Sequence, residues 1–121
     1  MAVVHRDMGC ANNGLDDWYW QRLSAVVLTI LLPLPYIILI WLLQGDVSQT
    51  TLLEILEHPV SRMLHSILML TLLIHAYIGI KVIVEDYVPL KIRIPFLGAM
   101  LMVTIALGFW WAALIWAWGA H

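Results

Sequence analysis

The sequence predicts an all-α membrane protein with three transmembrane helices. The chain has 121 residues, of which 63% are hydrophobic and only 12% are charged, and its mean hydropathy is +0.91. A soluble domain of this length could not bury so much apolar surface, because small folds leave a large share of their area in water. Three long stretches free of charge fit this class, since a helix needs about 20 apolar residues to cross a bilayer.

We expect the helices at residues 23–43, 61–84 and 95–118, in up-down-up order within a single membrane domain over residues 1–121. In the first span, Pro33 and Pro35 each remove a backbone donor, which predicts a bend. We interpret the bend as structural, and the alternative is that it opens a cofactor pocket. The second span should begin at His58-Pro59 and end before Val88-Pro89, because proline suits a first helical turn and disfavours helical geometry just before itself.

Basic residues predict the orientation of these spans. Five of the six flank the start of the first span or the loop between the second and third spans: Arg6, Arg22, Lys81, Lys91 and Arg93. Only Arg62 lies on the other side. We therefore expect the N-terminus and the Glu85–Arg93 loop in the cytoplasm, and the chain in a bacterial inner membrane. Tryptophans near the span ends fit the headgroup layers: Trp18, Trp20, Trp41, Trp116 and Trp118.

Composition also excludes some classes of function. The net charge of −2 is too small to indicate a nucleic-acid partner. The single cysteine, Cys10, allows no intrachain disulfide.

The second span carries the pattern His75-x₃-Gly79-x₆-Asp86-Tyr87. Residues four and eleven positions apart return to one helical face, so His75, Gly79 and Asp86 share a side. Ionisable groups at membrane depth are usually functional, and imidazole is a common axial ligand of haem iron. Position alone leaves ligation and a plain hydrogen bond to a neighbouring helix about equally favoured. Gly79 favours ligation, since its missing side chain would let a flat macrocycle or another helix approach.

One helix supplies only one axial ligand, because two ligands must approach the iron from opposite sides. His65 is an unsuitable second ligand, since ten residues place it about 80° around the helix. We therefore expect the second ligand on a different chain. His58 and His65 should make local hydrogen bonds, whereas the terminal His5 and His121 should be solvated.

Asp86 and Tyr87 lie about 16 Å along the helix from His75, near the predicted cytoplasmic headgroups. They fit either a solvated interfacial pair or a quinone site, in which the phenol donates to a carbonyl and the carboxylate orients a cation or passes protons. Arg22 fits two roles equally, extending to the interface or pairing with an anion such as a haem propionate or Asp86. Lys81 should extend to the interface, and Glu85 should be a solvated acid.

Several motifs together resemble the smaller hydrophobic membrane anchor of succinate:quinone oxidoreductase, which is succinate dehydrogenase or respiratory complex II. They are Gln21-Arg22-Leu23-Ser24-Ala25, His58-Pro59 and, most specifically, His75-Ala76-Tyr77-Ile78-Gly79 continuing into Val84-Glu85-Asp86-Tyr87-Val88. Chain length, three spans and orientation fit as well, so the resemblance covers nearly the whole chain.

The resemblance implies pairing with a second three-helix anchor, in one transmembrane bundle that holds haem b. His75 would be one axial ligand, Arg22 would lie near the propionates, and Tyr87 would hydrogen-bond ubiquinone or another quinone. Asp86 would fix an arginine of the second anchor. FAD would belong to a flavoprotein partner and the clusters to an iron–sulfur partner, so the chain is not catalytic alone. Within this family it would serve the tricarboxylic acid cycle and the respiratory chain.

The expected function is therefore that of a lipid-embedded anchor for succinate dehydrogenase. The alternatives are the anchor of a quinol:fumarate reductase, which runs the reaction in reverse, and a haem-free assembly or scaffold protein that uses His75 only for helix packing.

Overall fold

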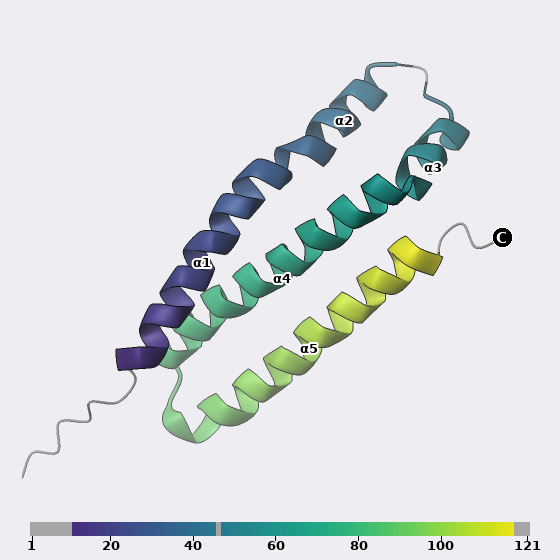
Figure 1. The fold of residues 1–121 in the computed structure, drawn as a ribbon. Helices are drawn as coiled ribbons and strands as arrows, with labels where there is room; N and C mark the ends of the chain where they lie inside the picture. Colours follow the sequence, from purple (N-terminus) through teal and green to yellow (C-terminus); the bar gives the residue numbers. More distant parts are fainter. Residues whose placement is uncertain (1–10, 46, 118–121) are drawn as a thin grey trace, which may run out of the picture.

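The computed structural model describes residues 11–45 and 47–117, and every regular element within them is helical (Figure 1). The helices are α1 (Ala11–Leu31), α2 (Pro33–Leu43), α3 (Gln49–Glu57), α4 (Pro59–Tyr87) and α5 (Leu90–Ala117). The predicted all-α class is confirmed.

Within the described residues, three helical stretches are long and apolar enough to cross a membrane. They are Gly14–Leu43, Pro59–Tyr87 and Leu90–Ala117, with 30, 29 and 28 residues. At 1.5 Å per residue each is about 40 Å long or more, which exceeds the roughly 30 Å hydrocarbon core. The helices therefore extend beyond the expected spans, whose last residue, 118, lies outside the described residues.

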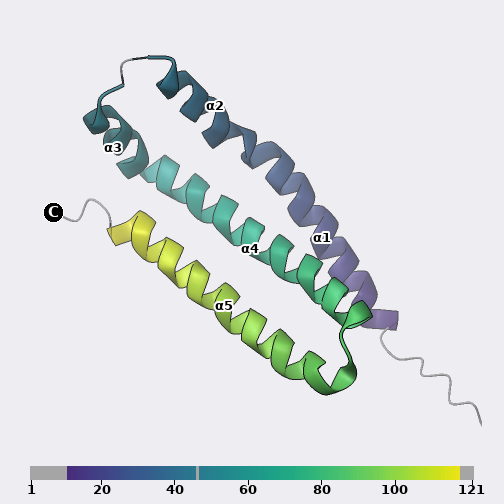
Figure 2. The same cartoon turned by 180° about the vertical axis from the view of Figure 1, so that it is seen from behind.

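Helix α4 is central in the arrangement. It packs against α1 on one side and against α5 on the other, and the two views agree on this order (Figures 1 and 2). The start of α1 and the α4–α5 turn lie at one end of the molecule, whereas α3 and the end of α5 lie at the other. We call these the α4–α5 end and the α3 end.

The prolines of the first span interrupt its helix as expected. Helix α1 ends at Leu31 and α2 begins at Pro33. The Leu32 amide still donates to the Leu28 carbonyl at 2.8 Å, but Pro33 and Pro35 have no N–H to continue the ladder. Beyond this break, α2 diverges from α4 toward the α3 end (Figure 1).

A short helix, α3, forms between the first two expected spans, where the sequence analysis predicted no helix. Ser48 caps it, because its hydroxyl oxygen accepts the Thr51 amide at 3.3 Å. The helix carries Leu52, Ile55 and Leu56 on one face among polar residues, which suits a position along the membrane surface rather than across it.

Both ends of α4 follow the predicted proline positions. His58 has extended geometry before Pro59, and its Nδ1 accepts the Val60 amide at 3.3 Å. The helix ends at Tyr87, where Val88 becomes extended before the next proline. Arg93 fastens the following turn, since its guanidinium donates to the Val88 carbonyl at 3.0 and 3.2 Å.

Close packing holds α5 against α4 at a glycine. A Cβ atom on Gly108 would lie 3.3 Å from Leu73 Cδ1, so the missing side chain permits the approach. Nearer the α3 end, the Trp116 indole N–H donates to the Ser66 hydroxyl at 3.2 Å.

The single chain has very little interior. Among the described residues, only Leu42, Ile78, Val84 and Ser24 are buried. Most apolar side chains of the three spans are exposed, which in water would be prohibitive but suits lipid or other membrane proteins. We therefore expect lipid or other membrane proteins to cover several faces of the chain.

Candidate functional site

His75 lies at the interface between α4 and α1. Its Nδ1 atom is 3.0 Å from the Ser24 hydroxyl oxygen, and its Nε2 atom is 3.4 Å from the Gln21 side-chain nitrogen. The imidazole is half-buried. Both ring nitrogens are thus engaged by one helix of the same chain, a feature that the His75 spacing alone could not show.

Gly79 lies one helical turn from His75 on the same interface. A Cβ atom there would lie 3.1 Å from the Gln21 side-chain nitrogen. The sequence predicted that this glycine admits a close neighbour, and in the single chain that neighbour is the amide of Gln21. Gln21 therefore contacts both members of the predicted haem motif.

The residues around His75 fit a haem. Gln21 Oε1 is buried and makes no hydrogen bond within the described part of the chain, and the bond from Gln21 to the imidazole is long at 3.4 Å. An amide held so weakly can leave the face of the imidazole by side-chain rotation alone. Its departure would uncover Nε2 next to the space at Gly79, which is the donor and the gap that a flat iron macrocycle requires.

Asp86 and Tyr87 occupy the last turn of α4, at the α4–α5 end. Both side chains are exposed, and Tyr87 retains 83% of its accessible surface. Within residues 11–45 and 47–117, neither makes a hydrogen bond or an ion pair. The two side chains therefore keep their hydrogen-bonding groups available at the end of a spanning helix. They can bind a ligand or a second protein at the headgroup level.

Lys81 differs from its predicted role. Its ammonium group does not simply extend to the interface but pairs with Asp17 Oδ2 at 2.6 Å, and Glu85 Oε1 is 4.0 Å away on the same helix. A lysine in the last turns of α4 reaches the first turns of α1, because both lie at the α4–α5 end. The pair ties α1 to α4 on the Asp86 side of His75.

Arg22 does not pair with Asp86 in the described part of the chain. Its guanidinium instead lies over the Trp18 ring, 4.1 Å from the ring centroid. Trp18 in turn meets Tyr19 edge to face, at 5.0 Å between centroids. This arrangement leaves the charge of Arg22 exposed, so pairing with a haem propionate stays a prediction.

The other described histidines make local hydrogen bonds, as expected. His65 Nδ1 donates to the Ser61 carbonyl at 2.7 Å, and His58 caps α4. His5 and His121 lie outside the described residues.

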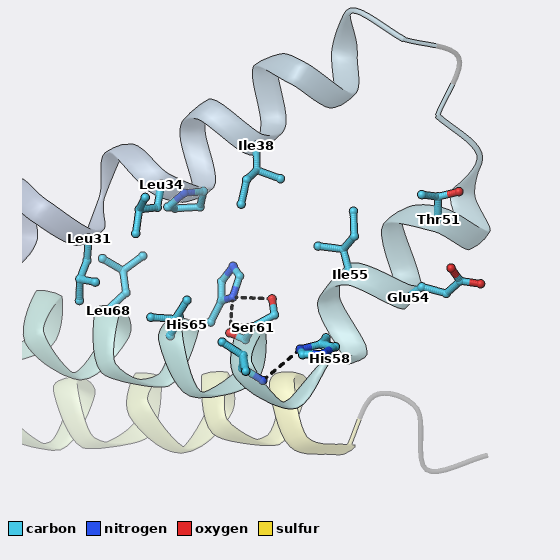
Figure 3. A pocket seen from close by; sticks show the side chains of 13 residues that line it. Leu31, Leu34, Ile38, Thr51, Glu54, Ile55, His58, Ser61, His65 and Leu68 are labelled. Atoms are coloured by element: carbon cyan, nitrogen blue, oxygen red, sulfur yellow. Dashed lines mark hydrogen bonds between the residues drawn. The ribbon is translucent and has the colours of Figure 1, made fainter.

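A cavity opens where the proline break separates α2 from α4 (Figure 3). Its volume is about 480 Å³, and its walls come from α1, α2, α3 and α4. Apolar side chains such as Leu34 and Ile38 line it, together with His58 and His65. The interpretation of the bend as structural stays a prediction. The cavity lies toward the α3 end and does not include His75, so it is not the predicted haem site.

Sequence reasoning assigned no role to Gln21 and Ser24, although both belong to a motif that carried the family resemblance. The missed signal is their spacing. Two polar residues three positions apart share a helical face, and in an apolar span such a face must find a polar partner. His75 is that partner.

The fold and these residues define a small helical membrane protein whose polar groups gather along one helix–helix interface and at one end of the spans. The family model described as the succinate dehydrogenase/fumarate reductase transmembrane subunit matches residues 3–115. The chain belongs to this family, as its motifs predicted, and is thus a membrane-embedded part of an assembly of several different chains. A comparison with curated proteins gave no match.

Proposed function

We propose that this chain is the membrane anchor of a succinate:quinone oxidoreductase, that it binds one haem b together with a second anchor, and that it completes a quinone-reduction site. One observation carries the proposal. His75 and Gly79 share the α1–α4 interface with a weakly held amide, and the same helix ends in an exposed Asp86-Tyr87 pair. Membership of the succinate dehydrogenase/fumarate reductase transmembrane family supports the proposal that these residues act within a membrane-bound complex of several chains.

His75 would hold the haem iron through its imidazole, and a residue of the partner anchor would hold it from the other side. When bound, the haem takes up and releases single electrons. Gly79 leaves room for the macrocycle beside the helix, and Arg22 offers an exposed guanidinium to its propionates. The low burial of the isolated chain supports this shared arrangement, because the second anchor has apolar helix faces to cover.

Tyr87 and Asp86 act at the quinone, which is the substrate. The Tyr87 phenol donates a hydrogen bond to a quinone carbonyl oxygen and so favours charge that develops there on reduction. The Asp86 carboxylate fixes a cation of the partner anchor or passes protons to the quinone. Reduction to the quinol consumes two electrons and two protons. The electrons come from the clusters of an iron–sulfur partner, and succinate is oxidised at the FAD of a flavoprotein partner.

The orientation of the chain follows from its basic residues. The α4–α5 end carries four basic residues, Arg22, Lys81, Lys91 and Arg93. By the positive-inside tendency, this end faces the cytoplasm. The quinone site then lies at the cytoplasmic surface of a bacterial inner membrane, and its protons come from that side.

A second candidate is the anchor of a quinol:fumarate reductase, which the family description includes equally. The same residues serve both directions, because the hydrogen bonds that assist quinone reduction assist quinol oxidation as well. The potentials of the cofactors and the quinone pool decide the direction.

Reduced-minus-oxidised spectra of the purified complex test the haem assignment. We expect a low-spin haem band that disappears in His75→Ala while the complex stays assembled. His65→Ala is the matched control, since that imidazole lies on the same helix but, among the described residues, bonds only to Ser61. A complex without the band would favour the haem-free scaffold, and a band unchanged in His75→Ala would remove His75 as the ligand.

A further inference from the structure

Ser24 is the most strongly buried polar residue of the described chain, with 5% of its surface exposed. It lies on α1 directly against the imidazole of His75, and its hydroxyl also donates to the Gln21 carbonyl at 3.0 Å. A buried hydroxyl in an apolar helix commonly bonds only to its own backbone. Ser24 does this and engages a ligand-type side chain as well.

The single hydroxyl hydrogen of Ser24 favours one tautomer of His75. Because the Ser24 hydrogen goes to the Gln21 carbonyl, the hydroxyl oxygen faces Nδ1 as an acceptor. The imidazole then carries its proton on Nδ1 and its lone pair on Nε2. The Gln21 side-chain amide faces Nε2 as a donor. The three bonds are mutually consistent: each hydrogen meets a lone pair.

The two contacts of the imidazole differ in strength. The bond to Ser24 is 3.0 Å long and buried on the serine side, whereas the bond to Gln21 is 3.4 Å and leaves Gln21 Oε1 without a partner. The first has ordinary hydrogen-bond geometry and the second is near the limit. Ser24 is therefore the permanent partner of His75, and Gln21 is the exchangeable one.

We infer that Ser24 is a positioning residue for the haem: by accepting the Nδ1 hydrogen of His75, it directs the Nε2 lone pair toward the iron. This inference rests on the proposed function, because it requires His75 to be the ligand. Gln21 occupies His75 Nε2 in the chain by itself, and its side chain would have to turn away for Nε2 to hold the iron. The inference assigns to α1 a part in ligation that the histidine motif of α4 does not contain.

The hydrogen bond from Nδ1 also tunes the ligand. A histidine that donates its second ring hydrogen is a more basic ligand and is fixed in orientation, and loss of such partners commonly lowers metal affinity 10- to 100-fold. A more basic imidazole favours ferric over ferrous iron. Removal of the Ser24 hydroxyl should therefore weaken haem retention and raise the reduction potential of the haem. A tenfold loss of ferric relative to ferrous affinity corresponds to about 59 mV for one electron.

The test compares Ser24→Ala with Ser24→Thr in the purified, fully assembled complex. Haem per complex, the potentiometric midpoint and the electron paramagnetic resonance spectrum of the ferric haem are measured. We expect Ser24→Ala to bind haem roughly tenfold less tightly, with a raised midpoint, and Ser24→Thr to restore both. Thr29→Ala is the matched control, because that hydroxyl also back-bonds within α1, to the Ala25 carbonyl at 2.8 Å, but does not touch His75.

The outcomes separate this inference from the function on which it rests. If the haem band is lost in His75→Ala yet Ser24→Ala keeps the wild-type midpoint and spectrum, the role of Ser24 is overturned and the proposed function stands. A wild-type complex without haem overturns the proposed function itself. Should Ser24→Ala fail to assemble, Ser24→Val and Ser24→Thr form an isosteric pair that differs mainly in the hydroxyl. Equal midpoints in that pair would also overturn the inference.

Discussion

The side-chain amide of Gln21 lies against Gly79, with its nitrogen 3.1 Å from the place where a Cβ atom on that glycine would stand. The contact joins α1 to the predicted haem motif of α4. It also shows what Gly79 provides in the chain by itself: a space filled by a flexible side chain that can move.

The haem content of Gly79 variants should depend on the size of the new side chain. Gly79→Ala needs only a small shift of the Gln21 amide, so we expect assembly and haem content close to those of the unsubstituted complex. Gly79→Leu fills the space beside His75 and should abolish haem binding while the partner chains still co-purify. Haem per complex is the measurement. Gly98→Leu is the control, because nothing lies within 4 Å of a Cβ at Gly98. Full haem content in Gly79→Leu would contradict the assignment.

The Asp17–Lys81 ion pair should stabilise the α4–α5 end. Both side chains are largely shielded, with 22% and 24% of their surface exposed, and the charged atoms are 2.6 Å apart. Lys81→Met leaves Asp17 without its partner, and we expect a lower midpoint of thermal unfolding in detergent. In a double-mutant cycle with Asp17→Asn, a coupling of about 1 kcal/mol fits a partly shielded pair. Lys91→Met, at an exposed lysine, is the control. Strictly additive effects would rule out a stabilising pair.

Gly108 should set the distance between α5 and α4. A Cβ atom at position 108 would lie only 3.3 Å from Leu73 Cδ1. The larger side chain of Gly108→Leu therefore forces the helices apart or distorts their side chains. Overpacking of this kind costs roughly 1–3 kcal/mol. We expect a lower thermal midpoint for the complex and unchanged haem in what assembles. Leu73→Ala added to Gly108→Leu should recover part of the loss, and no recovery would place the strain elsewhere.

The sequence was sufficient for features that depend on local chemistry. Apolar runs, prolines and basic residues placed the three spans, the break at Pro33 and both ends of α4, because each is decided by neighbouring residues and by the bilayer. It was also sufficient for the family, since the motif around His75 is specific.

Contacts between helices were not predictable in the same way. The partners of Lys81 and His75 lie on α1, more than 50 positions away, and the rotation of one helix against another decides which groups meet. The short helix α3 was missed because its four apolar residues are too few to span a membrane and its capping serine lies in a polar segment. The cavity near Pro35 depends on the direction in which α2 leaves α4, and no single residue encodes that direction.

Tyr87 is the residue on which the quinone assignment depends. Tyr87→Phe keeps the ring and removes the hydrogen-bond donor, so quinone reduction should fall by roughly 100- to 1,000-fold, in line with the loss of one oxyanion-type donor. Succinate oxidation with an artificial acceptor should stay unchanged, because the proposed function places that chemistry in a partner chain.

Tyr36→Phe is the matched control for this prediction. That tyrosine is likewise exposed but lies on α2, away from the α4–α5 end. Both activities of the complex should be unaffected by it. If Tyr87→Phe reduced the two activities equally, the defect would lie in assembly or in succinate oxidation, and the phenol would lose its place in the quinone site. A selective loss combined with a normal haem spectrum would locate the effect at the end of α4, separate from His75.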